Sequence, residues 1–598
     1  MKKMNILTGL FCLTAITSCD YLDKEPLDAI SSDQFYETAS AVSMEQYCNY
    51  LYPQLIVGYG APQSYDWGML GDDQTGDDLL MWDRNTTSFG LATIPSSASG
   101  TQWQWVNIRT CNDFLNNYDR SPESDDVKHR YAGEILFFKT LDYFNKVKTY
   151  GDVPWYDEVM NPGDEAMYKA RDSRVLVMQN MLRDIDQAIE WLPTRASGID
   201  VTRVTRDAAL ALKARMCLFE GTWRKYHDLD TENNIYLQEA YEAACELMKP
   251  EYGYSLYEGS SPSTCYHELF CLDDQSNNPE VIMSKAYDPS LSLGNNLTRQ
   301  IYVGETVMGL SKNLIDSYLC ATTGLPISIC GCEGHTTYTT LIDELNNRDP
   351  RLLQTTATPD PNNTNPWNYL SGNAPDIATI TELDSDNPGD PSRSATGYPV
   401  TKFYDPTEYT AAHYQGTEDA PVFRLGEIML IRAEAAAELG TITQTDLDET
   451  INALRARVGF NHKLTLNVNF SDPIIEQAYP NVQGDNPALI REIRRERRIE
   501  MFGEGVRYDD IRRWACGPSL MTAPRLGLNI YGVGYSQEQI DALLETVGIN
   551  EKGELTIYEK RYAGQSPTPI FEEPKHYLSP IPTDEIGLNP NLTQNPGW

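Results

Sequence analysis

The most informative pattern in this sequence is a row of apolar side chains between residues 206 and 223. They recur at spacings of three, four, three and four residues, the period of an α-helix that buries one face. The row consists of Ala209, Leu212, Met216, Phe219 and Trp223. Alanine also stands at every third position from 208 to 214, which would let a neighbouring helix approach closely. The pattern predicts a chain built from packed helices.

Other segments repeat this pattern. We expect a second helix over residues 235–248, with alanines on its apolar side, a further pair over 422–458, and a helix over 32–48. Gly440 is expected to end the first helix of the later pair, since glycine accepts the left-handed conformation that often closes a helix. Paired helices with small residues at their contacts are typical of tetratricopeptide-like repeats.

Loop sequences separate these helical blocks. Residues 57–100 are acidic and aromatic, and residues 250–420 are rich in Pro, Asn, Asp, Gly and Tyr, with turn sequences at 359–366 and 386–391. A loop region of this length inside a globular chain is usually functional or disordered, and its many rings argue against disorder.

Charge narrows the choice of partner. The 598 residues carry a formal charge of −38, and so acidic a surface repels phosphates, which makes nucleic acid a poor partner. The 36 tyrosines and 10 tryptophans exceed what a core needs, so rings are available for a binding surface.

The first eighteen residues have the order of a secretory signal. Lys2 and Lys3 precede a short apolar run over 6–16, and small residues then lead to Cys19. The run is too short for a membrane-spanning helix. Residues 16–19 also resemble the bacterial lipobox, which implies that Cys19 is acylated and becomes the new N-terminus; the alternative is ordinary cleavage beside an incidental cysteine.

Ten cysteines follow residue 19, which permits disulfides without fixing their connectivity. Cys330 and Cys332, with His335 nearby, are the residue types that bind zinc. A fourth ligand is missing and the usual two-residue gap between the cysteines is absent. The sequence therefore predicts neither a metal site nor a cofactor.

Residues 487–500 are predicted to form a helix that Asn486 caps and Pro487 begins. Five arginines lie between 491 and 498. Glu492, Glu496 and Glu500 interleave with them, so we expect ion pairs along the helix rather than a basic patch.

Residues 496–514, read onward from this helix, resemble the signature of the SusD/RagB family of Bacteroidetes surface lipoproteins. Further similar stretches lie at 19–23, 310–318, 347–352, 432–435, 577–586 and 594–598, so the resemblance covers the whole chain after the signal.

The resemblance implies an all-α fold, in which tetratricopeptide-like helix pairs form a right-handed superhelix that supports a loop-rich ligand-binding face. It implies a signal at 1–18 and one unit over 19–598, with helical parts at about 20–249 and 421–598 and the loop-rich insert at 250–420. Members capture oligosaccharides, act as a lid on a TonB-dependent transporter, and are anchored by lipid to the outer membrane, facing outward. They are not enzymes.

The ligand site is expected in the loops, because sugars stack their C–H faces on rings and offer hydroxyls to acids, amides and Arg. Residues 59–105 supply several rings, among them Tyr59, Tyr65 and Trp103. The predicted ligand-binding residues are Trp67, Asp72, Asp73, Trp82, Arg84, Asn85, Tyr287, Asn296, Arg299, Tyr302, Trp367 and Tyr369. Trp105, on a helix with Ile108 and Cys111, is expected in the core instead.

Two other functions stay open. A glycoside hydrolase needs two carboxylates about 5–10 Å apart, and 86 acidic residues could provide such a pair, although no nucleophile motif supports it. A helical-repeat protein could also bind a peptide or another nutrient, as some relatives of the family do.

Overall fold

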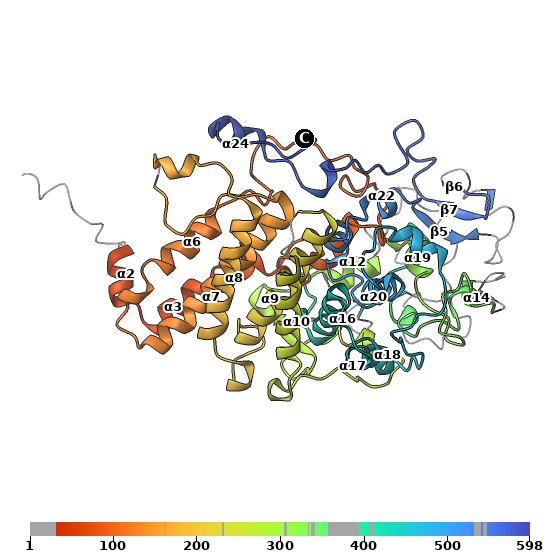
Figure 1. The fold of residues 1–598 in the computed structure, drawn as a ribbon, viewed down its shortest axis with the longest axis horizontal. Coiled ribbons are helices and arrows are strands. Elements are labelled where there is room, and N and C mark those ends of the chain that lie inside the picture. The colour runs from red at the N-terminus through yellow and green to blue at the C-terminus, as the bar shows by residue number, and fades with distance from the viewer. Residues whose placement is uncertain are drawn as a thin grey trace, which may run out of the picture.

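The computed structural model describes residues 32–598 apart from 162, 230–232, 304–307, 333, 336–340, 357–393, 406–411 and, between 531 and 546, all but 537, 540, 541 and 544. The predicted signal, Cys19, Trp367, Tyr369 and the turn sequences at 359–366 and 386–391 lie outside the described residues. The molecule is elongated, with the N-terminal helices at one end and a small sheet from the C-terminal part at the other (Figure 1). None of the helices it describes is long and apolar enough to cross a membrane.

Paired helices make up one half of the molecule, as the sequence predicted. Helix α7 packs on α8, α9 packs on α10, and α10 in turn packs on α16, which contacts α20. Their bounds are Asp125–Tyr150 (α7), Arg174–Trp191 (α8), Arg206–Tyr226 (α9), Asn233–Leu247 (α10), Leu425–Leu439 (α16) and Pro487–Glu500 (α20). The mostly helical, tetratricopeptide-like architecture is therefore confirmed.

Helix α9 lies at the centre of this arrangement. All five residues of its predicted apolar row are buried. The hydroxyl of Thr205 caps the helix by accepting a hydrogen bond from Ala208 N–H at 3.3 Å. A β-carbon at Gly221 would lie 2.9 Å from the backbone nitrogen of Leu237, so glycine is what lets α9 and α10 approach so closely.

The apolar periodicity located some helix ends correctly and missed others. Gly440 closes α16 with φ 74°, as predicted. The helix expected over 32–48 is instead two helices, α2 (Ser32–Thr38) and α3 (Ala41–Asn49), because Ser40 leaves the helical conformation to cap α3 through Ser43 N–H. After Gly440 the chain likewise forms two short helices, α17 (Gln444–Glu449) and α18 (Ile451–Arg457).

The other half of the molecule holds short elements and loops around a second hydrophobic core. Its strands, which the sequence did not predict, pair antiparallel: β1 (Leu79–Leu80) with β3 (Gly309–Leu310), β2 (Val281–Lys285) with β4 (Ala420–Arg424), and β7 (Glu554–Thr556) with both β5 (Leu526–Asn529) and β6 (Gly548–Ile549). The other α-helices with bounds in the described residues are α4 (Tyr52–Leu55), α5 (Gly68–Asp72), α6 (Val106–Leu115), α11 (Cys265–Glu268), α12 (Leu297–Val303), α13 (Lys312–Ile315), α14 (Leu341–Leu345), α19 (Pro473–Ala478), α21 (Arg507–Arg513), α22 (Gly517–Leu520) and α24 (Thr583–Leu588).

Helix α20 begins as predicted, with Asn486 accepting a hydrogen bond from Leu489 N–H. Its arginines do form ion pairs, but the predicted partners along the helix are mostly wrong. Arg495 pairs with Glu492 of the same helix, whereas Arg494 pairs with Glu438 and Arg497 with Asp510. The helix is buried between neighbours that carry their own acids, so most of its charges pair across the fold.

The carboxylate of Glu500 is the clearest example. It is fully buried and pairs with Arg351 at 2.9 Å, Arg424 at 2.9 Å and Arg457 at 2.6 Å. These three guanidiniums hold the pKa of Glu500 far below its usual range, although burial alone would raise it. Because an unpaired charge in the interior is costly, this cluster depends on all its members being present.

Candidate functional site

A tightly closed loop over residues 57–68 forms one wall of the candidate site. Met69 N–H donates to the carbonyl of Gly58 at 2.9 Å, which brings the two ends of the loop together. Gly68 has φ +51°, and a β-carbon there would lie 2.1 Å from the Gly58 oxygen, so the closure requires glycine. The ammonium of Lys285 on β2 donates to the carbonyl of Gly60 at 2.9 Å and fixes the loop on the sheet.

This loop presents Tyr65 to solvent, with 56% of its surface exposed. The Tyr65 ring meets those of His413 and Tyr414 edge to face, at centroid distances of 5.5 and 5.6 Å. Arg299 of α12 lies against His413, with its Nε 3.2 Å from Nδ1. We call Tyr65, Arg299, His413 and Tyr414 the aromatic corner.

Buried amides hold the corner together from below. Asn296 Oδ1 accepts a hydrogen bond from Tyr414 N–H at 3.2 Å. The backbone of Asn295 exchanges two hydrogen bonds with Gly416, each 3.0 Å long, and Gln63 N–H donates to the carbonyl of Gly294. Three segments far apart in the sequence are therefore locked together behind the exposed rings.

Two carboxyl groups lie beneath this surface. Glu418 is buried and accepts hydrogen bonds from Thr298 Oγ1 and, at 3.3 Å, from Asn295 Nδ2. Burial raises its pKa from 4.5 to about 7. Burial likewise raises the pKa of Asp419 to about 6, despite hydrogen bonds from the backbone N–H groups of Gln275 and Tyr287. Both groups are occupied with internal partners and support the corner from within.

Several predicted ligand residues lie at or under the corner. Arg299 is half-buried within it, and Asn296 and Tyr287 are 2% and 5% exposed, so these two build the site from behind. Tyr287 donates to the carbonyl of Gly60 at 2.8 Å. Trp67 is half-buried and caps α5 beside the loop. Tyr302 lies in α12, the helix that carries Arg299.

Two other predicted ligand residues, Arg84 and Asn85, make contacts within the protein. Arg84 donates to the carbonyls of Gln565 and Ser566 at 2.6 and 2.7 Å, and its guanidinium lies 3.8 Å from the centre of the Tyr562 ring. Asn85 Oδ1 accepts hydrogen bonds from the N–H groups of residues 87 and 88, which makes a local turn. These two side chains are engaged in internal contacts rather than left free for a ligand.

The two predicted aspartates separate. Asp72 is exposed at the end of α5. Asp73 is 1% exposed and accepts a hydrogen bond from Gly503 N–H at 2.6 Å, so it is part of the interior and is not offered to a ligand. The acidic stretch was expected in a loop, but Asp72 ends α5 and Asp73 begins a short 3-10 helix (Asp73–Thr75), and the hydrogen bond that holds the buried Asp73 comes from a residue more than 400 positions away.

The sequence prediction missed His413 and Tyr414. They lie near the end of the loop-rich insert over 250–420 and carry no motif, and the signal that could have found them is an adjacent pair of rings in a region already expected to bind. Tyr65 was noticed among the available rings but not selected.

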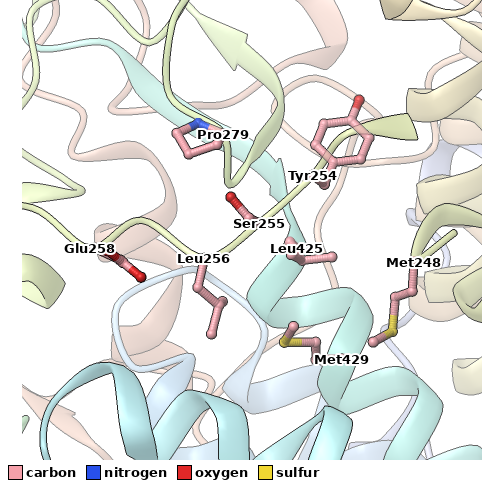
Figure 2. A pocket seen from close by; sticks show the side chains of 8 residues that line it. All are labelled: Met248, Tyr254, Ser255, Leu256, Glu258, Pro279, Leu425 and Met429. Atoms are coloured by element: carbon pink, nitrogen blue, oxygen red, sulfur yellow. The ribbon is translucent and has the colours of Figure 1, made fainter. Parts of the chain in front are cut away.

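Three cavities are alternative candidates for the ligand site. One, of 580 Å³, lies between α10, α16 and the segment 254–258 (Figure 2). Its floor is apolar, with Met248, Leu425 and Met429, and the hydroxyl of Tyr254 is directed away from the two methionines and donates to Asp207 at 2.6 Å. Tyr254 supplies the one aromatic ring among the described residues that line it and its hydroxyl is already bonded, so this cavity is less suited to a sugar than the corner.

A second cavity, of 450 Å³, is lined by Trp103, Trp105, Tyr156 and the apolar side of α24. Trp105 packs edge to face on Trp103 and Tyr156 at 5.6 and 5.5 Å and is half-buried against the first core. The expectation that Trp105 is mainly a packing residue agrees with these contacts. A third cavity, of 490 Å³, lies between α19, α20 and the segment 326–328 and is lined by both charged and apolar side chains.

Comparison with known proteins gives the family. A profile described as "SusD family" matches residues 279–598, more than half of the chain. The chain belongs to the SusD family. A further profile, described as "Starch-binding associating with outer membrane", matches residues 20–218. The family assignment drawn from the sequence motifs is confirmed, and the family is associated with the outer membrane.

Three relatives of this SusD family member match it over nearly their full lengths. SusD-like protein P2 of Formosa agariphila is 21% identical over all of both chains. A crystal structure of a SusD-like carbohydrate-binding protein from Bacteroides fragilis has a TM-score of 0.72 at 22% identity, covering 94% of this chain and 100% of the other. Surface glycan-binding protein A from Bacteroides thetaiotaomicron has a TM-score of 0.58 at 16% identity, covering 94% and 100%. At such identities these two structures support the fold.

Proposed function

We propose that this SusD family protein is a surface lipoprotein that binds oligosaccharides at the aromatic corner and delivers them to a TonB-dependent transporter. The observation that carries the proposal is Tyr65, a largely exposed ring held in place by His413 and Tyr414. Solvent-exposed rings fixed on a closed loop are the surface that a sugar needs, because no ordering of the loop is required on binding.

The chemistry of the corner suits a sugar. A ring the size of Tyr65 that covers the C–H face of a sugar contributes on the order of 1–3 kcal/mol. Arg299 supplies donors for hydroxyl groups, and the exposed Gln63 and Asp66 on the loop supply an amide and a carboxylate. The two structural relatives are described as a carbohydrate-binding and a glycan-binding protein, which agrees with this choice of ligand.

Binding without catalysis is the favoured interpretation. A glycosidase needs two carboxyl groups facing the substrate about 5–10 Å apart. Near the corner, Glu418 has the raised pKa of a general acid, but it is 1% exposed and bonded to Thr298 and Asn295. It lies beneath the surface on which a glycosidic bond would rest.

Anchoring and delivery complete the proposal. Cys19 follows a lipobox-like sequence, and lipoprotein processing supplies more than one acyl chain, which stable anchoring requires. The regular helical half offers a rigid platform for a large contact with a transporter, while the corner is left to the ligand. Capture of a peptide or another nutrient by the same type of lid protein is the alternative.

The test compares Tyr65→Ala with Tyr50→Ala, a matched control on another exposed tyrosine, 46% exposed at the end of α3. A glycan array and a peptide pool select the ligand, and calorimetric titration measures its affinity. Tyr65→Ala should weaken glycan binding about tenfold to hundredfold, while Tyr50→Ala should bind normally. Selection from the peptide pool alone would replace the sugar with a peptide, normal binding by Tyr65→Ala would move the site elsewhere, and new reducing ends would make the protein an enzyme.

A further inference from the structure

Three cysteines and one histidine meet in the loop-rich half of the molecule. Cys320, Cys330, Cys332 and His335 each direct one ligand atom to a common point, and these four atoms all lie within 4.8 Å of one another. The sequence interpretation rejected a metal because the Cys330, Cys332 and His335 set lacked a fourth ligand. The fold supplies that ligand as Cys320. We propose that these four side chains form a structural zinc site.

The spacing of the ligand atoms suits a tetrahedral ion. With Zn–S bonds of about 2.3 Å and Zn–N bonds of about 2.0–2.1 Å, the edges of a tetrahedron are about 3.8 Å between two sulfurs and about 3.6 Å between sulfur and nitrogen. Cys320 Sγ and Cys332 Sγ are 3.6 Å apart, and Cys330 Sγ is 3.3 Å from His335 Nδ1. These two pairs need only small outward shifts to bind an ion, and the other pairs of ligand atoms lie within 4.8 Å of one another.

The surroundings orient the ligands. His335 Nε2 lies 3.2 Å from the carbonyl oxygen of Asn346, so this nitrogen carries the proton and donates it, leaving the lone pair of Nδ1 for the metal. Cys332 N–H donates to Cys330 Sγ at 3.4 Å, which stabilises a thiolate on Cys330. A histidine held by a backbone carbonyl is the usual second layer around a bound zinc.

Charge also favours an ion here. Three thiolates, a neutral imidazole and Zn²⁺ carry a net charge of −1. Cys320 forms a β-bridge with Arg348, whose guanidinium is buried and donates to the carbonyls of Ile315, Tyr318 and Glu344. None of the described carboxylates forms an ion pair with Arg348. A zinc–thiolate centre would place a compensating negative charge beside it.

A disulfide between Cys320 and Cys332 is the competing arrangement. It would use two of the four groups and leave Cys330 beside His335 with no bond to make. All ten cysteines in the described part of the chain are free thiols. The convergence of the third sulfur and the oriented imidazole on the same point is explained by a metal and not by a disulfide.

The ion would act as a clamp. The turn between Cys320 and Cys330 carries Pro326, Ile327 and Ser328, which form one wall of the 490 Å³ cavity beside α20. Tying both ends of this turn to one ion fixes that wall, in a region with little regular secondary structure to hold it. The clamp is independent of the aromatic corner, so either proposal can fail without the other.

Metal analysis of the wild-type full-length lipoprotein, extracted in mild detergent, tests the site directly. The chain is reduced without oxygen, incubated with ZnCl₂ and desalted, and its zinc is measured by plasma mass spectrometry. We expect about one zinc per chain. Replacement of zinc by Co²⁺ should give thiolate charge-transfer absorption in the near ultraviolet together with the intense visible bands of tetrahedral cobalt.

Variants then assign the ligands. Cys330→Ser and His335→Ala should lower the zinc content to about a tenth or less, while Cys245→Ser, which removes a half-buried cysteine outside the cluster, should keep it. Circular dichroism checks that each variant is folded, and the wild-type measurements stand even if a variant is not. Wild-type protein without zinc or a cobalt–thiolate band would overturn the proposal. So would a Cys320–Cys332 disulfide in protein alkylated at harvest, or zinc retained in both ligand variants.

Discussion

The guanidinium of Arg561 lies 3.7 Å from the centre of the Trp82 ring and so covers one of its faces. Arg561 also forms an ion pair with Asp83 at 2.7 Å, which holds it there. Trp82 was predicted to bind ligand, yet the face a sugar would use already has a cation on it. Among the described residues no cation covers the Tyr65 ring, and this difference separates two rings that look equivalent in the sequence.

We therefore expect Trp82→Ala to affect stability more than binding. Loss of the cation–π contact and of the half-buried ring should lower the free energy of unfolding by about 1–2 kcal/mol. Glycan affinity should change less than about threefold, well under 1 kcal/mol. Thermal melts and calorimetric titration of Trp82→Ala beside Tyr65→Ala measure both. A tenfold loss of affinity with an unchanged melting temperature would return Trp82 to the ligand site.

The buried carboxyl of Glu418 should make stability depend on pH. Its pKa is about 7 in the folded protein against 4.5 as the ordinary value, so between these pH values the folded state holds a proton that the unfolded chain has lost. Its contribution to stability therefore falls as pH rises through this window. Glu418→Gln removes the effect, and its stability relative to wild type should increase by about 2–3 kcal/mol between pH 5 and pH 8.

Urea unfolding at both pH values measures this difference. Asp288→Asn is the control: hydrogen bonds from Ser290 lower the pKa of Asp288 below 3.8, so it stays ionised throughout the window. Its stability relative to wild type should not change between pH 5 and pH 8. If the stability difference between Glu418→Gln and wild type is also the same at pH 5 and pH 8, Glu418 is already ionised in the folded protein at pH 5.

The Glu500 cluster should be the most sensitive point of the fold. Glu500→Gln leaves Arg351, Arg424 and Arg457 buried with one carboxylate fewer, and we expect a loss of about 3–5 kcal/mol in the free energy of unfolding. Glu37→Gln breaks an ion pair with Arg120 at 3.0 Å, but the Glu37 side chain is 65% exposed. It should cost about 1 kcal/mol or less. If urea unfolding gives equal losses of stability for Glu500→Gln and Glu37→Gln, burial does not strengthen the ion pairs of Glu500.

Lipid attachment is tested at Cys19. Cys19→Ala should move the protein from the membrane to the soluble fraction, because the acyl chains supply about 0.8 kcal/mol for each buried CH₂. Fractionation followed by a salt wash gives the result, with Cys48→Ala as a control that leaves the anchor intact. Retention of the Cys19→Ala protein in the outer membrane would contradict the anchor.

Gentle extraction of the wild-type protein from membranes should also recover a TonB-dependent transporter bound to it. Recovery of the transporter apart from this protein would contradict the partnership.

Periodic features could be predicted from the sequence because their cause is local. The buried row on α9, the cap at Asn486 and the glycine that ends α16 each depend on a few neighbouring residues. Ion-pair partners and site residues could not be predicted in this way. Tyr65 meets His413 and Tyr414 across about 350 residues, and nothing near either segment specifies the other.

The proposed zinc ligands could not all be recognised from the sequence either, although they lie close together in it. Cys320 is only ten residues before Cys330, but the spacing matches no usual pattern, and its position depends on the bridge to Arg348. Loops gave weaker predictions than helices because a loop side chain takes its direction from whatever packs against it. Asp72 and Asp73 are adjacent, yet one is exposed and the other is buried.

The pairing of Arg498 with Asp77 and Asp78, and of Arg507 with the same two aspartates, makes closure of the loop-rich half depend on residues near the end of the chain. The aspartates are 1% exposed in the final structure and more than 400 residues ahead of their partners. Until Arg498 and Arg507 have reached their places in the fold, the two aspartates lack these partners, and burying their charges would be costly. The N-terminal helices can pair early because their contacts are local, whereas the loop-rich half can close only when the chain is nearly complete.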